Sequence, residues 1–337
     1  MRKPAVLITG ASGEIGHGLI EQLSAEGDRA IVTLDLAPLA PALAGKVQRE
    51  VIGSIMDRPA LDRILAEYEV DVVYHLAALL STRSEFSPLT AHEVNVGGTL
   101  NLLEFAQQQS STHGRPVIFM YPSSIAVYGL TRETKIGAGK VREDQFTEST
   151  TMYGCNKLYC EQLGRYYMKH YKQLSAEASS GHVDFRGIRF PGLISAVTVP
   201  SGGTSDFAPE MIHAAAKGEA YACFVREDAR IPFMAMPDGV AALLKLAKAP
   251  RERLTLPCYN IGAFNPSAGE VEAEVRRAFP NAQISYKIDT KRQGIVDSWP
   301  ADVDDAAARR DWGFAPTYNF ESAFREYLIP TIKARYS

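Results

Sequence analysis

The first half of the chain alternates short, continuous apolar runs with longer amphipathic stretches. Ala5-Val6-Leu7-Ile8 is apolar at four successive positions, which is typical of a parallel strand buried on both faces. The pattern predicts strands at Pro4–Thr9, Arg29–Leu34, Lys46–Ile52, Asp71–His75 and Val117–Tyr121, and helices at Glu14–Glu26, Asp57–Glu69 and Leu89–Gln109. Strands that alternate with helices indicate βαβ units, and therefore an α/β fold with a doubly wound parallel sheet.

The second half is less regular. Leu130–Ser149 is polar and rich in Gly and Lys, which predicts a surface loop. A helix from near Tyr153 to about Ala176 follows, then a strand at Val183–Phe190 that ends in Pro191-Gly192. Shorter helices are expected at Asp206–Lys217, Asp238–Ala249, Ser267–Phe279 and Phe320–Ala334.

A length of 337 residues favours two closely associated domains. We expect a dinucleotide-binding Rossmann domain over residues 1–180. Residues 181–337 should form mainly a smaller, mixed α/β substrate-binding domain, with some segments that return to the first domain.

Composition narrows the choice of partners. A formal charge of −3 offers no electrostatic footprint for nucleic acid or for an anionic membrane. No apolar stretch approaches the ~18 residues that a membrane-spanning helix needs. The four cysteines are sparse and unpatterned, which fits a reducing, cytoplasmic location, and neither cysteines nor histidines show metal-ligand spacing. We therefore expect no metal.

A glycine-rich loop, Gly10-x-x-Gly13-x-x-Gly16, joins the first predicted strand to the first helix. Glycines allow a tight turn and a close approach of backbone N–H groups to a pyrophosphate, and the helix N-terminus adds partial positive charge. The spacing differs from the usual Gly-x-Gly-x-x-Gly fingerprint. The loop residues assigned to a dinucleotide are Gly10, Gly13, Glu14, Ile15 and Gly16.

Asp35 closes the second predicted strand, where a carboxylate accepts hydrogen bonds from the adenosine ribose. Its charge would repel a 2′-phosphate, and Leu36-Ala37-Pro38 supplies no arginine to reverse that preference. The expected cofactor is NAD rather than NADP.

Tyr153 and Lys157 are one helical turn apart and share a helix face. A free tyrosine titrates near pH 10, and bringing it to neutrality needs ~4 kcal/mol of added phenolate stabilisation. Lys157 would supply part of this, and the positive ring of an oxidised nicotinamide more. Tyr153 is then the candidate general base for an alcohol, with Lys157 lowering its pKa and binding ribose.

Ser123-Ser124 follows the strand predicted at Val117–Tyr121, at the carboxyl edge where open α/β sheets bind ligands. Ser124 is the candidate for orienting the substrate hydroxyl, and Ser123 is a neighbouring substrate contact. The alternative is that both serines only form a turn.

The order of glycine loop, serine pair and Tyr/Lys helix resembles the extended short-chain dehydrogenase/reductase family over essentially the whole chain. The resemblance implies cofactor contacts at Ser54, Ile55, Leu76, Ala77, Ala78, Asn95 and Pro191, besides Tyr153 and Lys157. Many relatives carry an aspartate where this chain has Ser54, which puts the adenine contact in doubt.

Within that family the chain is similar to the metal-free L-threonine 3-dehydrogenases. The segments that carry this likeness are Tyr121–Gly129, Arg189–Ser195, Gly202–His213, Arg230–Asp238 and Asp297–Pro300. The likeness implies NAD-dependent oxidation of the L-threonine 3-hydroxyl to L-2-amino-3-oxobutanoate. It also implies that Ser81 and Thr204 bind the amino acid's charged groups, although Thr204 alternatively is a turn residue beside Gly202-Gly203. Trp299 is a candidate to close over the substrate, or alternatively packs in an interface or in the core.

The sequence also allows two other interpretations of the protein's function. A nucleotide-sugar epimerase or dehydratase on the same scaffold would need cations for a diphosphate, and Arg226 and Arg230 are candidates. A non-catalytic NAD-binding sensor would need the glycine loop but not the Tyr/Lys pair.

The family likeness further implies a homodimer through two helices of each subunit, one of them the Tyr153 helix. Its outer face carries Tyr159, Tyr166 and Met168, which alternatively pack internally.

Overall fold

A computed structural model describes residues 3–175, 181–200 and 202–336. Its centre is a parallel sheet of seven strands in the order β11-β7-β5-β4-β1-β2-β3. The strands are β1 (Lys3–Thr9), β2 (Ala30–Asp35), β3 (Arg49–Ile52), β4 (Tyr68–His75), β5 (Val117–Ser124), β7 (Val183–Phe190) and β11 (Cys258–Asn260). The strand order reverses beside β1, so the doubly wound Rossmann-type sheet predicted from the sequence is confirmed.

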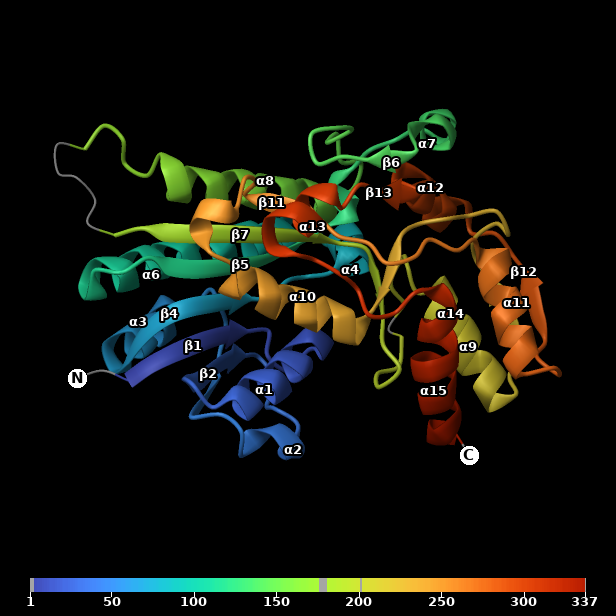
Figure 1. Ribbon diagram of the computed structural model, residues 1–337, viewed down its shortest axis with the longest axis horizontal. Helices are drawn as coiled ribbons and strands as arrows, with labels where there is room; N and C mark the ends of the chain where they lie inside the picture. Colours follow the sequence, from blue (N-terminus) through green and yellow to red (C-terminus); the bar gives the residue numbers. More distant parts are fainter. Residues whose placement is uncertain (1–2, 176–180, 201, 337) are drawn as a thin grey trace.

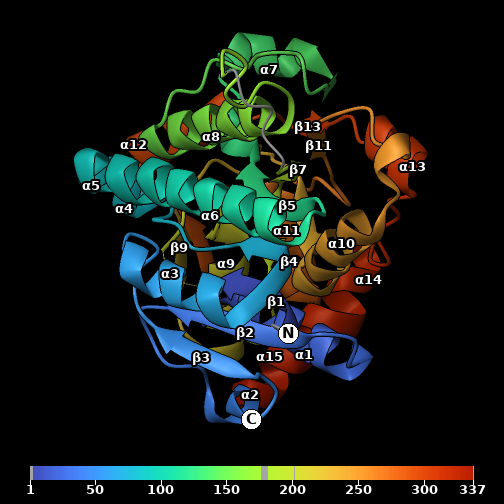
Figure 2. The same cartoon turned by 90° about the vertical axis from the view of Figure 1, so that its left-hand side faces the viewer.

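Helices cover both faces of this sheet (Figure 2). One layer holds α3 (Arg58–Glu67), α6 (Gly98–His113) and α8 (Met152–Lys169), and the other holds α1 (Glu14–Glu26) and α10 (Met236–Lys248). Side chains alternate along β1: Ala5 and Leu7 join the core under α3 and α6, whereas Val6 and Ile8 join the core under α1 and α10. Burial on both faces explains why the strand is apolar at every position.

Beyond β7 the chain builds a second core on one end of the sheet (Figure 1). Two small parallel pairs, β8 (Gly192–Ile194) with β10 (Phe233–Ala235) and β9 (Tyr221–Cys223) with β12 (Ile284–Tyr286), pack with three helices. These are α9 (Phe207–Lys217), α11 (Ala268–Ala278) and α15 (Ile329–Tyr336). From the same half, β11 and α10 return to the central sheet. The domain division at residue 180 falls outside the described residues and stays a prediction, and Ala176 and Ser201 lie outside them too.

Several predicted boundaries were wrong. The helix predicted at 57–69 ends at Glu67, because Tyr68 and Glu69 already pair with β1 as the start of β4. The helix predicted at 89–109 belongs to one longer helical run of α5 (Pro88–His92), a π-helical turn (Glu93–Gly97) and α6. β5 continues three residues past Tyr121, because Pro122 stays in the ladder beside Ile188 although proline is usually excluded from a central strand.

The segment predicted as a surface loop, residues 130–149, contains α7 (Arg132–Ala138) and β6 (Lys140–Val141). β6 pairs with β13 (Asp302–Val303), and α7 lies beside α12 (Thr290–Ser298) at the top of Figure 1. Residues 140–141 and 302–303 are far apart in the sequence, so local sequence patterns could not predict that they pair. The sequence also did not predict α2 (Pro41–Ala44), α4 (Ser81–Phe86), α12 or α13 (Ala306–Trp312), while α14 (Phe320–Ser322) and a π-turn (Ala323–Leu328) subdivide the last predicted helix.

Candidate active site

The glycine loop lies at the carboxyl end of β1, against the turn that follows β4. Gly10 has φ +67°, and a Cβ built on it would lie 2.6 Å from the backbone nitrogen of Ala77. Gly16 is equally restricted, since a Cβ there would lie 2.3 Å from the carbonyl oxygen of Ala11. Only glycine fits these two positions, and the loop is thereby pressed against Leu76-Ala77.

The N-terminus of α1 and Asp35 together fit a dinucleotide. Gly13 is the N-cap of α1 and provides no side-chain cap, so the first-turn N–H groups are directed at the loop's outer side. The Asp35 carboxylate accepts hydrogen bonds from the backbone N–H groups of Ser12 (2.9 Å) and Ala37 (3.0 Å). This places an anionic acceptor beside the loop at the position expected for ribose recognition.

Buried polar contacts fix the backbone next to this seat. The Asn95 side chain binds both the N–H (2.7 Å) and the C=O (3.0 Å) of Leu79. His75 lies between the hydroxyls of Thr9 and Thr99, at 2.9 Å from each, and burial lowers its pKa to about 3. Asn95 thus acts on the chain that follows β4 and holds the segment containing Ala77 and Ala78 in place.

The remaining predicted cofactor residues surround the same edge. The Ser54 hydroxyl accepts a hydrogen bond from the N–H of Met56, a local turn contact. Ile55 packs against Gly98, where a Cβ would lie 2.2 Å from the Ile55 Cδ1 atom. Pro191 is buried directly after β7. Their roles toward a cofactor stay predictions.

Tyr153 and Lys157 lie on α8, whose first turn is capped by the Thr151 hydroxyl. The Lys157 ammonium donates to the carbonyl oxygen of Pro122 (2.6 Å) and lies 5.4 Å from the centre of the Tyr153 ring. Within the described chain, the Tyr153 phenol has no hydrogen-bond partner, so it is available to a ligand.

The electrostatics differ from the sequence expectation. Burial raises the pKa of the Tyr153 phenol, whereas the neighbour was expected to lower it. Burial also lowers the pKa of Lys157, to about 8, against the attraction of Glu161. Desolvation accounts for the shift at the partly buried Tyr153 and is the largest cause of the shift at Lys157, which is buried.

Gly154 brings the Tyr153 helix close to Ser124. A Cβ on Gly154 would lie 1.9 Å from the carbonyl oxygen of Ala126, in the short 3₁₀ turn Ile125–Val127 that Ser124 caps. Ser124 accepts a hydrogen bond from the Ala126 N–H (3.2 Å), and no described acceptor takes its own hydroxyl hydrogen. The sequence analysis missed Gly154; a glycine next to a candidate base was the available signal.

Ser123 points elsewhere. Its hydroxyl donates to the Glu161 carboxylate (2.5 Å), and Glu161 forms a two-point ion pair with Arg189 (2.9 and 2.7 Å). All three are buried. The structure therefore does not bring the Ser123 hydroxyl to the open side of the site, and its predicted substrate contact stays a prediction without geometric support. Glu161 and Arg189 were missed; the Tyr153, Lys157, Glu161 spacing of four was the signal.

Ser81 and Thr204 are brought together although 123 residues separate them, with their hydroxyl oxygens 3.5 Å apart. Ser81 begins α4, which packs on α8, and Glu85 of α4 accepts from the Met152 N–H (2.7 Å) at the start of α8. This pair therefore lies beside the Tyr153 helix.

Trp299 ends α12 and is buried, and its Nε1 atom has no hydrogen-bond partner among the described residues. Its neighbour Ser298 accepts from the Thr150 hydroxyl (3.0 Å), just before α8. Trp299 and Tyr153 pack in the same core cluster.

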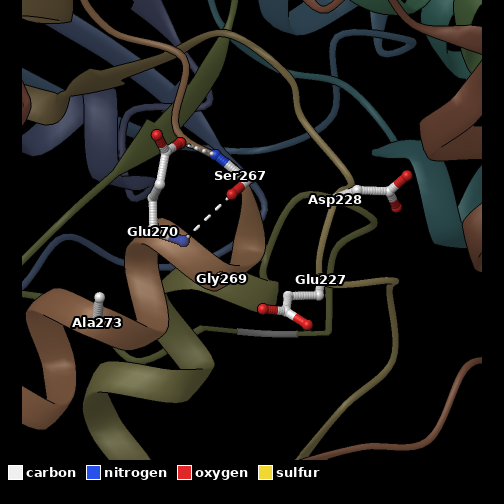
Figure 3. A pocket seen from close by; sticks show the side chains of 6 residues that line it. All are labelled: Glu227, Asp228, Ser267, Gly269, Glu270 and Ala273. Carbon is white, nitrogen blue, oxygen red and sulfur yellow. Dashed lines mark hydrogen bonds between the residues drawn. The ribbon is translucent and has the colours of Figure 1, made fainter.

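The two arginines considered for a diphosphate are engaged elsewhere. Arg226 binds both oxygens of Asp297 (2.8 and 2.9 Å), and Arg230 pairs with Glu270 (2.8 Å). Beside them is a hollow of about 410 Å³ whose walls come from Glu227, Asp228, Ser267, Gly269, Glu270 and Ala273 (Figure 3). Three carboxylates in this wall would repel a diphosphate, and the hollow shares no residue with the predicted site.

Within residues 3–175, 181–200 and 202–336, no group of three or more His, Cys, Asp or Glu side chains could hold a metal ion. No helix in these ranges combines the length and apolar composition needed to cross a membrane.

A doubly wound parallel sheet with a glycine loop and a Tyr/Lys helix at its carboxyl edge defines a class of nicotinamide-dependent oxidoreductases and epimerases. Residues 6–262 match the NAD dependent epimerase/dehydratase family, and the chain belongs to that family. It is 32% identical over 333 residues to an uncharacterized epimerase/dehydratase of Staphylococcus haemolyticus, covering 98% of each chain.

Solved structures add a narrower likeness. An L-threonine dehydrogenase from Clostridium difficile has a TM-score of 0.85 and 32% identity, covering 100% of this chain and 99% of that one. A monomeric L-threonine 3-dehydrogenase from a metagenome has a TM-score of 0.84 and 33% identity, covering 98% and 100%. Both similarities cover nearly the whole chain, so the fold that they share extends beyond residues 6–262.

Proposed function

We propose that this protein is an NAD-dependent L-threonine 3-dehydrogenase that oxidises the 3-hydroxyl of L-threonine to L-2-amino-3-oxobutanoate. The observation that carries the proposal is the convergence of Ser81 and Thr204 beside the Tyr153 helix, in a chain whose whole length resembles structures of that activity. A bound NAD would accept the hydride from the substrate carbon.

Tyr153 is the proposed general base. It immediately precedes Gly154, which approaches the 3₁₀ turn that Ser124 caps, and its phenol oxygen has no competing partner among the described residues. Since burial raises its pKa, the phenolate would gain stabilisation from Lys157 and from a positive nicotinamide ring bound beside it. Proton removal would then be coupled to cofactor binding.

Lys157 and Ser124 support this base. Pro122 holds the Lys157 ammonium in place, so that it stabilises the developing phenolate and reaches a ribose hydroxyl. Ser124 donates its unused hydroxyl hydrogen to the reacting oxygen, which orients the alcohol toward Tyr153.

The proposed substrate fits the polar groups at the rim. Ser81 and Thr204 are small hydroxyl donors suited to a zwitterion, and the buried Trp299 N–H is a donor without a partner in the described chain. A nucleotide-sugar substrate would need free cations, whereas Arg226 and Arg230 are already paired.

We further propose a cytoplasmic homodimer with the outer face of α8 in its interface. Tyr159 and Tyr166 are 52% and 40% exposed there, which favours a contact, whereas Met168 packs against the core. One similar structure is described as monomeric, so the measurement that decides is the mass in solution by light scattering.

The experiment that tests the activity follows NADH formation by absorbance with NAD and a panel of L-threonine, L-serine, L-allo-threonine and UDP-sugars. We expect rapid turnover with L-threonine alone. Turnover or thermal stabilisation by a UDP-sugar, without oxidation of L-threonine, would establish the epimerase or dehydratase reading instead. NAD binding without any turnover would establish the sensor.

A further inference from the structure

Charged side chains bind both the N–H and the carbonyl group of Gly203. Its N–H donates to the Asp206 carboxylate (2.7 Å), and its carbonyl oxygen accepts from the Arg292 guanidinium (2.6 Å). A Cβ on Gly203 would lie 2.9 Å from an Asp206 carboxylate oxygen, so a larger residue would displace the side chain that binds the Gly203 N–H. The N–H belongs to the peptide between Gly202 and Gly203 and the carbonyl to the peptide between Gly203 and Thr204, so charge-assisted hydrogen bonds fix two successive peptide groups more firmly than ordinary turn contacts.

Arg292 is itself fixed. Asp289 caps α12 by accepting from the Arg292 N–H (3.1 Å), and the guanidinium carbon lies 3.2 Å from the centre of the buried Phe224 ring. Glu210 and Asp206 are the acidic groups near this end of the site, and Arg292 offsets the burial that raises the pKa of Glu210. The described chain gives Arg292 only one hydrogen-bond acceptor, the Gly203 carbonyl, so most of its donors are not committed.

The Gly203 carbonyl belongs to the peptide that joins Gly203 to Thr204. The Thr204 hydroxyl is 3.5 Å from that of Ser81, and the Thr82 hydroxyl donates to the Gly202 carbonyl (3.1 Å). The turn at residues 202–204 is therefore connected to α4 on one side and to α12 on the other. A shift of Arg292 would move Thr204 relative to Ser81.

We propose that Arg292 is the positioning residue for the carboxylate of an α-amino acid substrate. Arg292 binds the Gly203 carbonyl, which orients the Thr204 hydroxyl toward the substrate carboxylate. Because Gly203 directly precedes Thr204, the positive charge of Arg292 also favours an anion beside Thr204. This inference rests on the proposed function, and it adds the group that selects an amino acid over a simple amino alcohol.

The test compares two alcohols that differ only in the carboxylate: L-threonine and (R)-1-amino-2-propanol. Three variants are compared with the wild type: Arg292→Met, Arg292→Lys and, as a matched control, Lys291→Met. Lys291 is the exposed neighbour on the same helix, so its variant loses the same charge without touching Gly203. Steady-state kcat and KM are measured for both alcohols, together with the melting temperature.

For Arg292→Met we expect kcat/KM to fall about 10- to 100-fold for L-threonine, mainly through KM, because the lost charge-assisted contacts serve the carboxylate. The value for the amino alcohol should change by less than about twofold. Arg292→Lys should recover part of the loss, since it keeps the charge and one donor, and Lys291→Met should match the wild type.

Equal falls for both alcohols in folded Arg292→Met would overturn the inference and leave Arg292 a purely structural residue. If Arg292→Met does not fold, Arg292→Lys decides by the same comparison, since a lysine keeps the fold-supporting charge but loses the planar fork. Failure of the wild type to oxidise L-threonine would refute the proposed function itself, which a selective loss in one variant does not.

Discussion

The two ends of the central sheet differ in the polar groups that they leave free for a ligand. At the amino end, charges are paired: Arg29 with Asp71 (3.1 Å), Arg115 with Glu69, and Arg186 with Asp184 (2.6 Å). At the carboxyl end Arg189 is paired with Glu161, but the indole N–H of Trp299 has no partner within the described ranges, and the Tyr153 phenol forms no hydrogen bond there. Satisfied polar groups stabilise a fold, whereas unsatisfied ones are retained where a ligand completes them.

Two arginines of β7, both buried and paired, connect the sheet to different helices. Arg186 binds Asp184 and three carbonyl oxygens at the end of α10, those of Leu246, Ala247 and Ala249. Arg189, three residues on, binds Glu161 of α8 and, through it, Ser123. One buried cation ties the sheet to a covering helix, and the other ties it to the helix that carries the candidate base.

The sharpest way to test the contrast is to remove the phenol oxygen at the carboxyl end. Tyr153→Phe should lower kcat about 10²–10⁴-fold, the usual contribution of a general base, with the melting temperature nearly unchanged. Tyr159→Phe, an exposed tyrosine on the same helix, is the control and should retain activity. Retained turnover in Tyr153→Phe would refute the assignment of the base.

The two buried ion pairs can be broken separately. Glu161→Gln and Asp184→Asn should each reduce the free energy of unfolding by about 3 kcal/mol, because each leaves a buried arginine without its counter-charge. Denaturant unfolding measures this. Per folded molecule, only Glu161→Gln should lower kcat, since Glu161 alone connects to Ser123 and α8. Equal kcat in both variants would contradict a link between Arg189 and the site.

A pair of glycine variants isolates the cofactor seat. Gly10 and Gly27 have similar backbone torsions, φ +67° and +70°, but only Gly10 is crowded by Ala77. Gly27→Ala should cost about 1 kcal/mol of stability from the left-handed conformation, and Gly10→Ala should cost more, because its Cβ would also clash with the Ala77 backbone. Gly10→Ala should also weaken NADH binding by about tenfold or more, followed by fluorescence titration, because the loop must move. Unchanged NADH affinity in Gly10→Ala would place the cofactor elsewhere.

The smallest expected effect concerns pH. In the folded protein Lys157 has a pKa of about 8, below its ordinary value. Above pH 8 the unfolded chain therefore binds more protons than the folded chain. Burial of the charged form destabilises the fold below pH 8, and this cost disappears as pH rises toward the unfolded pKa of ~10.4. The melting temperature of the wild type, relative to Lys157→Met, should therefore rise above pH 8. A pH-independent difference would show that Lys157 is not desolvated.

Part of the candidate site at the carboxyl end could be predicted from the sequence. The glycine loop, Asp35 and the Tyr153/Lys157 pair are local patterns whose spacing alone predicts a seat and a base, and the sheet that carries them was predicted correctly. The direction of the Tyr153 pKa was not, because it depends on burial by distant segments.

Contacts between remote segments could not be predicted from periodicity. Pairing of β6 with β13 turned a predicted loop into structure, and the Ser123 hydroxyl is bound by a buried carboxylate that no local motif announces. The meeting of Ser81 with Thr204 was implied only by family resemblance; physically it needs α4 and the Gly203 turn to be placed by the fold.

The strand pair β6–β13 has a consequence for biosynthesis. Residues 140 and 141, which precede the Tyr153 helix, pair with residues 302 and 303, which are translated much later. A nascent polypeptide emerging from the ribosome could build most of the parallel sheet first, yet β6 would remain unpaired until residue 303 had been synthesised. Premature termination before residue 302 would thus yield a Rossmann core with an unfinished catalytic rim.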